Sequence, residues 1–112
     1  NGVSLGAAML AAKKEKGNFQ RMAHCYYGNG FSNQEIEKYL KEAKIKFTKY
    51  KNIEEKVAKK IANGKIIGWF QGKAEVGARA LGNRSILANP IIKNMKNKLN
   101  AEVKHRENWR LF

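Results

Sequence analysis

Residues 68–90 read GWFQGKAEVGARALGNRSILANP, and the middle of this stretch, residues 71–85, indicates what kind of site the chain forms. Three glycines, Gly72, Gly77 and Gly82, stand five residues apart, and glycine lets a backbone turn sharply and come close to a ligand. Around them lie side chains that donate hydrogen bonds: Gln71, Lys73, Arg79, Asn83, Arg84 and Ser85. A packed core has no use for this mixture, whereas a site that surrounds an oxyanion with backbone and arginine does.

The glycine spacing invites comparison with the phosphate-binding P-loop. Gly77 and Gly82 have the separation of G-x-x-x-x-G-K-[ST], but Asn83 and Arg84 follow, so the lysine that reaches the terminal phosphates is missing from its place. The dinucleotide pattern G-x-G-x-x-G does not occur either. Both named phosphate motifs are therefore excluded, and the cations must be interpreted individually.

Arg79 and Arg84 are five residues apart, which on a helix would point them about 140° away from each other. They can converge on one anion only if the chain bends at Gly82. Glu75 is a candidate counter-ion that holds one of the two arginines in place. The alternative is a glycine-rich turn whose cations are simply solvated.

Charge is the outlier in the composition. The 112 residues contain 23 Lys and Arg against 9 acidic residues, a net charge of +14, which favours polyanions, phosphorylated metabolites or an anionic membrane surface. Scattered, solvated lysines on helical faces explain the same number. The single Cys25 excludes an intrachain disulfide and no Cys/His spacing resembles a zinc site, so we expect a cytoplasmic protein without a metal in this segment. The longest apolar run, residues 5–12, is shorter than the roughly 18 residues of a membrane span.

Periodicity predicts one α/β or α+β domain with the glycine-rich segment at the end of a strand. The alanine face of the first helix suits packing against another element. Ser32 and Glu35 form a capping box at the start of the second helix, and Asn52 caps a third helix that ends at Gly64. Residues 65–71 suit a central strand. The expected helices are 1–16, 32–44, 52–64 and 92–103, and the expected strands are 23–27, 45–50, 65–71 and 85–88.

The C-terminal residues form a second, less specific basic patch. His105 is a candidate donor to a ligand, although a lone histidine in a basic tail is more often a surface residue. Arg106 and Arg110 would share a face if this segment is helical. Trp109 and Phe112 are expected to be packing anchors.

Residues 71–87 strongly resemble the signature of the C-terminal domain of NodU-type carbamoyltransferases, roughly QGR-x-E-x-GPRALGNRSIL. Thirteen positions match: Gln71, Gly72, Glu75, Gly77, Arg79, Ala80, Leu81, Gly82, Asn83, Arg84, Ser85, Ile86 and Leu87. The resemblance continues outward to Leu5-Gly6-Ala7-Ala8, to Tyr27-Gly28, and to Val103-Lys104-His105-Arg106-Glu107 with Arg110. It therefore covers nearly the whole chain.

The resemblance implies a YrdC-like domain, a twisted mixed sheet flanked by helices, that follows an actin-like domain. Residues 1–17 would then be a helix continuing from the actin-like domain, which would hold the metal, and residues 18–112 would be an incomplete C-terminal domain. It also implies a reaction in two stages. Carbamoyl phosphate and ATP form carbamoyl adenylate in the C-terminal domain, and the N-terminal domain then transfers the carbamoyl group to a hydroxyl of an acceptor molecule. ATP would be a co-substrate, and the N-terminal domain of the same protein a partner.

By the same resemblance, Arg79 and Arg84 would be catalytic, because they stabilise charge that develops on the phosphate oxygens. The residues expected to bind substrate or nucleotide are Gln71, Lys73, Glu75, Gly77, Gly82, Asn83, Ser85, His105, Arg106 and Arg110.

Three positions depart from the family pattern. Lys73 replaces an arginine, which keeps the charge but loses the bidentate fork, and Ala78 and Leu111 replace prolines. We expect that these 112 residues alone do not complete carbamoyl transfer.

A nucleic-acid-binding module is the alternative function, favoured by the charge and by the RNA affinity known among YrdC-like folds. The aromatic residues stand mainly at apolar helix and strand positions and are not interleaved with arginine, which favours a small ligand over RNA.

Overall fold

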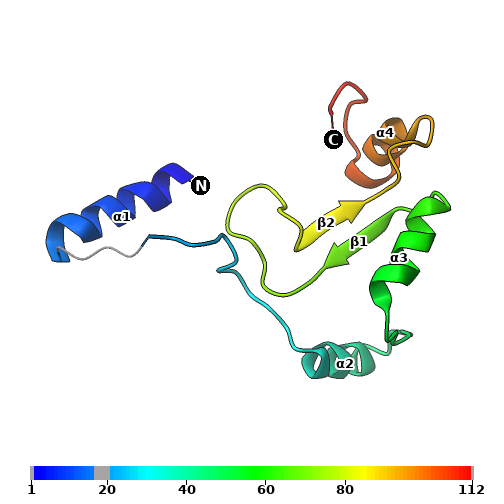
Figure 1. Ribbon diagram of the computed structural model, residues 1–112, viewed down its shortest axis with the longest axis horizontal. Helices are drawn as coiled ribbons and strands as arrows, with labels where there is room; N and C mark the ends of the chain where they lie inside the picture. Colours follow the sequence, from blue (N-terminus) through cyan, green and yellow to red (C-terminus); the bar gives the residue numbers. More distant parts are fainter. Residues whose placement is uncertain (1, 17–20, 112) are drawn as a thin grey trace.

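The computed structural model describes residues 2–16 and 21–111, and Figure 1 shows their arrangement. Helices and a small sheet occur together, which confirms the mixed α/β class. In chain order the elements are α1 (Gly2–Lys16), α2 (Asn33–Glu42), α3 (Ile53–Ala62), β1 (Ile67–Phe70), β2 (Arg84–Leu87), α4 (Met95–Lys98) and the π-helix η1 (Leu99–Lys104).

Local sequence signals explain α2 and α3. The Ser32 hydroxyl accepts the backbone N–H of Glu35, whose carboxylate accepts the backbone N–H of Ser32, which confirms the capping box. The side chain of Asn52 likewise accepts the backbone N–H of Glu55 at the start of α3. Gly64 follows α3 with a φ of 79°, a conformation that glycine adopts without strain.

The sheet consists of β1 and β2, paired antiparallel with Ile67 opposite Leu87 and Phe70 opposite Arg84. Both strands lie close to their expected positions. The expectation that residues 65–71 form a central strand is wrong among the described residues, because in a two-stranded sheet both strands are edges. The hairpin nevertheless fixes both ends of residues 71–83, which we call the signature loop.

Two further expected strands are absent from the described part of the chain. Residues 45–50 carry Ile45, Phe47 and Tyr50 with polar residues between them, yet no described strand pairs with this segment. Residues 23–27, the short strand considered within the connection of residues 18–30, form no strand; the carbonyl of Cys25 instead accepts the backbone N–H of Val76 in the signature loop. The pattern of apolar and polar residues within one segment is therefore not sufficient, because a β-strand also needs a neighbouring strand with which to pair.

The last helical region begins later than its periodicity predicts. Helix α4 starts at Met95, after Asn94 with a φ of 65°, and continues directly into η1. His105, with a φ of 48°, ends this region, so Arg106 and Arg110 do not share a helical face. Trp109 is 72% exposed and therefore is not a packing anchor here, while Phe112 lies outside the described residues.

The described residues bury little apolar surface. Met95 and Leu99 are the buried hydrophobic residues, at 5% and 6% exposure. Figure 1 shows α1 standing apart from the sheet, and its side chains from Gly2 to Glu15 are exposed except for the half-buried Met9. The alanine face of α1 is therefore exposed within the residues that the structure describes. None of the described helices has the length and apolar character needed to cross a membrane.

Candidate functional site

The signature loop leaves β1 at Phe70 and returns to β2 at Arg84, with glycine at its sharpest turns. Gly77 and Gly82 have φ angles of 119° and 112°, a region that L residues rarely adopt. Nothing lies within 4 Å of where a Cβ would be at either position, so glycine is needed there for its backbone angles and not for space. Gly82 thus has the backbone angle of a turn between Arg79 and Arg84.

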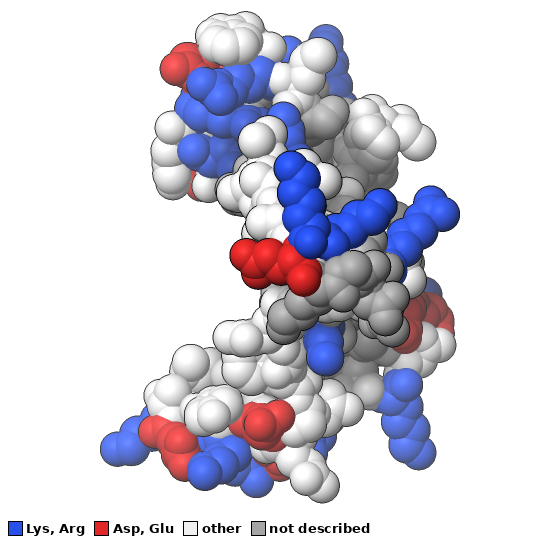
Figure 2. Space-filling view, turned by 90° about the vertical axis from the view of Figure 1, so that its left-hand side faces the viewer, with Lys and Arg blue, Asp and Glu red and all other residues white. Residues whose placement is uncertain are grey.

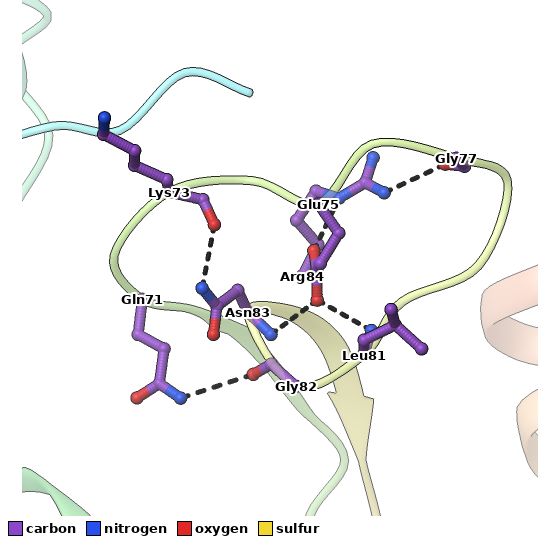
Figure 3. A network of polar contacts seen from close by, with 8 residues as sticks. All are labelled: Gln71, Lys73, Glu75, Gly77, Leu81, Gly82, Asn83 and Arg84. Carbon is purple, nitrogen blue, oxygen red and sulfur yellow. Dashed lines mark hydrogen bonds and ion pairs between the residues drawn. The ribbon is translucent and has the colours of Figure 1, made fainter. Parts of the chain in front are cut away.

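A buried carboxylate holds the loop together (Figure 3). Glu75 is 3% exposed, and its Oε1 accepts the backbone N–H groups of Leu81 at 2.7 Å and Asn83 at 2.8 Å. Its Oε2 accepts Nε of Arg84 at 2.9 Å, and Nη2 of Arg84 donates to the carbonyl of Gly77 at 3.1 Å. Glu75 is therefore the counter-ion of Arg84, and it binds the far side of the loop through backbone donors.

The contacts of Glu75 also set its charge state. Burial raises the pKa of Glu75, because loss of water disfavours a carboxylate. The backbone N–H groups of Asn83 and Leu81, together with the Arg84 guanidinium, outweigh burial and lower the pKa from 4.5 to about 2. Glu75 is consequently an anion at neutral pH.

This lowered pKa predicts how stability depends on pH. A carboxyl group whose pKa falls on folding contributes stability that is fully present above its unfolded pKa, here 4.5, and that is lost as the pH falls towards about 2. The unfolding midpoint of the parent protein should therefore exceed that of Glu75→Gln by a constant amount above pH 4.5, and the difference should shrink below it. Glu37, whose pKa is also lowered to about 2 by hydrogen bonds from Lys41 and Lys49, is present in both proteins and cancels. A difference that does not change with pH would contradict this assignment.

Amide side chains close the base of the loop. Nδ2 of Asn83 donates to the carbonyl of Lys73 at 2.8 Å, and Nε2 of Gln71 reaches the carbonyl of Gly82 at 3.5 Å. The backbone N–H of Gln71 also donates to the carbonyl of Asn83 at 3.0 Å. Two of the expected donors, Gln71 and Asn83, are thus engaged in shaping the loop.

Arg79 and Lys73 differ from Arg84 in having no such partner. Within residues 2–16 and 21–111, no hydrogen bond or ion pair engages the side chain of either one, and both residues are exposed. Figure 3 shows the ammonium of Lys73 pointing away from Glu75. Ser85 lies half-buried on β2, opposite Trp69. Among the described residues, the loop therefore pairs Arg84 with a carboxylate and leaves Arg79 and Lys73 without such a pairing.

The C-terminal candidates belong to a separate cluster beside α4 (Figure 1). Asn100 is completely buried; its Oδ1 accepts Nε of Arg106 at 2.8 Å, and its Nδ2 donates to the carbonyl of Arg110 at 2.9 Å. Arg110 pairs with Glu107 at 3.0 Å, and His105 is exposed. Asn100 does not stand out in the sequence, where its only signal is its position directly after the apolar Leu99.

The remaining charge is dispersed. Figure 2 shows Lys and Arg side chains over the top, middle and bottom of one face, with acidic side chains among them, and no single basic stripe on that face. Among the residues that the structure describes, no three or more His, Cys, Asp or Glu side chains are grouped so as to hold a metal ion.

Comparison with known proteins places this site in a family. The family described as carbamoyltransferase C-terminus matches residues 58–112, which include the whole signature loop. Nodulation protein NolO of Bradyrhizobium diazoefficiens is 37% identical, over 99% of this chain and 21% of NolO. Nodulation protein U of Rhizobium tropici is 33% identical, over 98% of this chain and 18% of that protein.

A third relative has a more specific name. The 3'-hydroxymethylcephem-O-carbamoyltransferase of Amycolatopsis lactamdurans is 46% identical, over 45% of this chain and 9% of that enzyme. The chain spans about a fifth or less of the length of these three relatives. From its match to the family at residues 58–112 and its similarity to the nodulation proteins along nearly all its length, the chain belongs to the NodU-type carbamoyltransferases, of which it contains the C-terminal segment.

Proposed function

We propose that the signature loop binds the phosphate groups of carbamoyl phosphate and ATP, and that the whole protein uses them to form carbamoyl adenylate and carbamoylate a hydroxyl acceptor. The observation that carries this proposal is that one of the three cations pairs with a carboxylate and the other two do not. Glu75 pairs with Arg84, while the exposed Arg79 and Lys73 have no ion pair among the described residues. Gly72, Gly77 and Gly82 give the loop backbone its positive φ angles. Exposed cations on a preorganised loop are suited to an anionic ligand.

The chemistry fits this arrangement. Carbamoyl phosphate and ATP both present phosphate oxygens, and a guanidinium binds such oxygens in pairs. Formation of carbamoyl adenylate consumes one water: water cleaves carbamoyl phosphate to carbamate and phosphate, and a carbamate oxygen then bonds to the α-phosphorus of ATP as the bond to pyrophosphate breaks. In both steps negative charge moves onto the oxygens of a leaving phosphate group. In this proposal Arg79 binds and stabilises those oxygens. Arg84 is a positioning residue, because its pairing with Glu75 holds the loop in place.

In this proposal the acceptor does not bind to these 112 residues alone. One relative is named for carbamoylating a hydroxymethyl group, and we propose the same chemical class of acceptor, an alcohol, for this protein. A domain outside these 112 residues would bind that acceptor, with residues 18–112 as the activating domain and residues 1–17 leading into it. His105, Arg106 and Arg110 would contribute only if a ligand extends to α4.

The test uses the protein as encoded by its gene, without an acceptor. Pyrophosphate release from ATP should require carbamoyl phosphate, and calorimetry should detect binding of both ligands. A short RNA should bind no better than the counter-ion effect of its phosphates predicts, with affinity falling steeply as salt is raised. Pyrophosphate release that ignores carbamoyl phosphate would contradict the proposal, as would tight RNA binding that survives 200 mM salt.

A further inference from the structure

A segment far from the signature loop in sequence lies against it in space. Residues 25–30, which we call the clamp segment, precede the family match at residues 58–112. Its contacts with the loop are backbone hydrogen bonds: Gly28 N–H to the carbonyl of Ala74 at 2.9 Å, Ala74 N–H to that of Asn29 at 2.9 Å, and Val76 N–H to that of Cys25 at 2.8 Å. A further antiparallel bridge joins Gly30 to Lys73.

These bonds surround the buried carboxylate. Ala74 and Val76 are the two neighbours of Glu75, and the clamp segment binds the backbone of both. The Glu75 side chain meanwhile accepts from Leu81, Asn83 and Arg84. The backbone on both sides of Glu75 is therefore bound to the clamp segment, and its carboxylate is bound to Leu81, Asn83 and Arg84. A shift of residues 74–76 would change the position of the carboxylate and so disturb these three contacts.

Gly28 makes the close approach possible. A Cβ at this position would lie 2.9 Å from both the backbone oxygen and the Cβ of Ala74, closer than real Cβ contacts, and the backbone oxygen cannot rotate away. Gly28 does not have a positive φ, so its role is space and not backbone angle. At Gly30 the added Cβ would lie 3.0 Å from the carbonyl oxygen of Gly72 and from Cγ of Lys73, a milder conflict.

Local contacts give the clamp segment its shape. The Tyr27 N–H donates to the carbonyl of Cys25 at 3.0 Å, and the Tyr26 N–H donates to Nδ1 of His24 at 3.2 Å. The rings of His24 and Tyr27 lie 4.6 Å apart between centroids. The segment thus arrives at the loop with a defined conformation of its own.

We infer that the clamp segment is part of the phosphate site, because it sets the position of Glu75 and of the loop cations, and that Gly28 is the positioning residue on which this depends. The inference rests on the proposed function for the chemistry it supports. Its structural content, the coupling of residue 28 to the Glu75 network, stands independently. Gly28 itself touches no substrate in this scheme.

The experiment uses Gly28→Ala in the protein as encoded by its gene, with Gly68→Ala as the matched control, since a Cβ at Gly68 meets nothing within 4 Å. We expect kcat/KM for carbamoyl phosphate to fall about 10- to 100-fold, mainly through a higher KM, because a displacement of about 1 Å is enough for such a loss. Amide hydrogen exchange at Leu81 and Asn83 should accelerate in Gly28→Ala and stay at the parent rate in Gly68→Ala.

The two readouts separate this inference from the proposed function. Unchanged exchange at Leu81 and Asn83 in Gly28→Ala overturns the inference, whatever the activity. If the parent protein neither binds carbamoyl phosphate nor releases pyrophosphate, the proposed function fails, while exchange still decides the coupling. Parent kcat/KM in Gly28→Ala, with an active parent, also overturns the inference. Should Gly28→Ala unfold the whole protein, the milder Gly30→Ala is subjected to the same two measurements with the same criteria.

Discussion

Glu75→Gln is expected to lower carbamoyl phosphate-dependent pyrophosphate release by about 100-fold, the loss typical of a displaced catalytic geometry. The amide oxygen of glutamine can still accept a backbone N–H, but its NH₂ group would face Nε of Arg84, donor against donor. The Arg84 guanidinium would also lose its counter-ion inside the loop. Both effects release the loop from the single carboxylate that joins residues 75, 81, 83 and 84.

Glu102→Gln is the control, because Glu102 is exposed and its side chain has no hydrogen bond or ion pair among residues 21–111. It removes the same charge and should retain parental activity. Combining Glu75→Gln with Arg84→Gln completes a double-mutant cycle, and the double variant should lose less than the product of the two single losses, since both remove one interaction. Parental kcat/KM in Glu75→Gln would show that the carboxylate does not organise the site.

Arg79→Ala is expected to weaken carbamoyl phosphate and ATP binding by about 10- to 100-fold, the equivalent of one charge-assisted hydrogen-bonding group. Because Arg79 is exposed and makes no hydrogen bond or ion pair within the described part of the chain, its removal should leave the unfolding midpoint unchanged. This separates it from Glu75→Gln, which should lower both activity and stability. Isothermal calorimetry and thermal unfolding of the same preparations measure the two effects.

Arg79→Lys and Arg21→Ala sharpen this second test. Lysine keeps the charge but not the planar fork, so Arg79→Lys should recover only part of the lost affinity. Arg21 is an exposed arginine outside the loop, and Arg21→Ala should bind as the parent does. Equal losses in Arg21→Ala and Arg79→Ala would mean that net charge alone attracts the ligand, and the assignment of Arg79 would be wrong.

Signals confined to a few neighbouring residues were sufficient for part of the fold. The Ser32–Glu35 capping box, the Asn52 cap and the turn at Gly64 are interactions over three or four positions, and the structure contains them where the sequence predicts them. The need for positive φ at Gly77 and Gly82 is equally local. The strand expected at residues 45–50 is absent from the structure. A pattern of apolar and polar residues is a property of one segment, whereas strand pairing requires a second segment beside it.

The roles of the two arginines also depend partly on local sequence and partly on contacts between distant segments. Their residue types and spacing, together with the family resemblance, identify the signature loop as an anion site, because glycine freedom and guanidinium chemistry are properties of the residues themselves. Which arginine Glu75 neutralises, and that residues 25–30 bind both neighbours of Glu75, depends on contacts between positions distant in the chain. Such contacts exist only once the backbone has folded, and so tertiary structure alone distinguishes Arg84, which pairs with Glu75, from Arg79, which has no ion pair among the described residues.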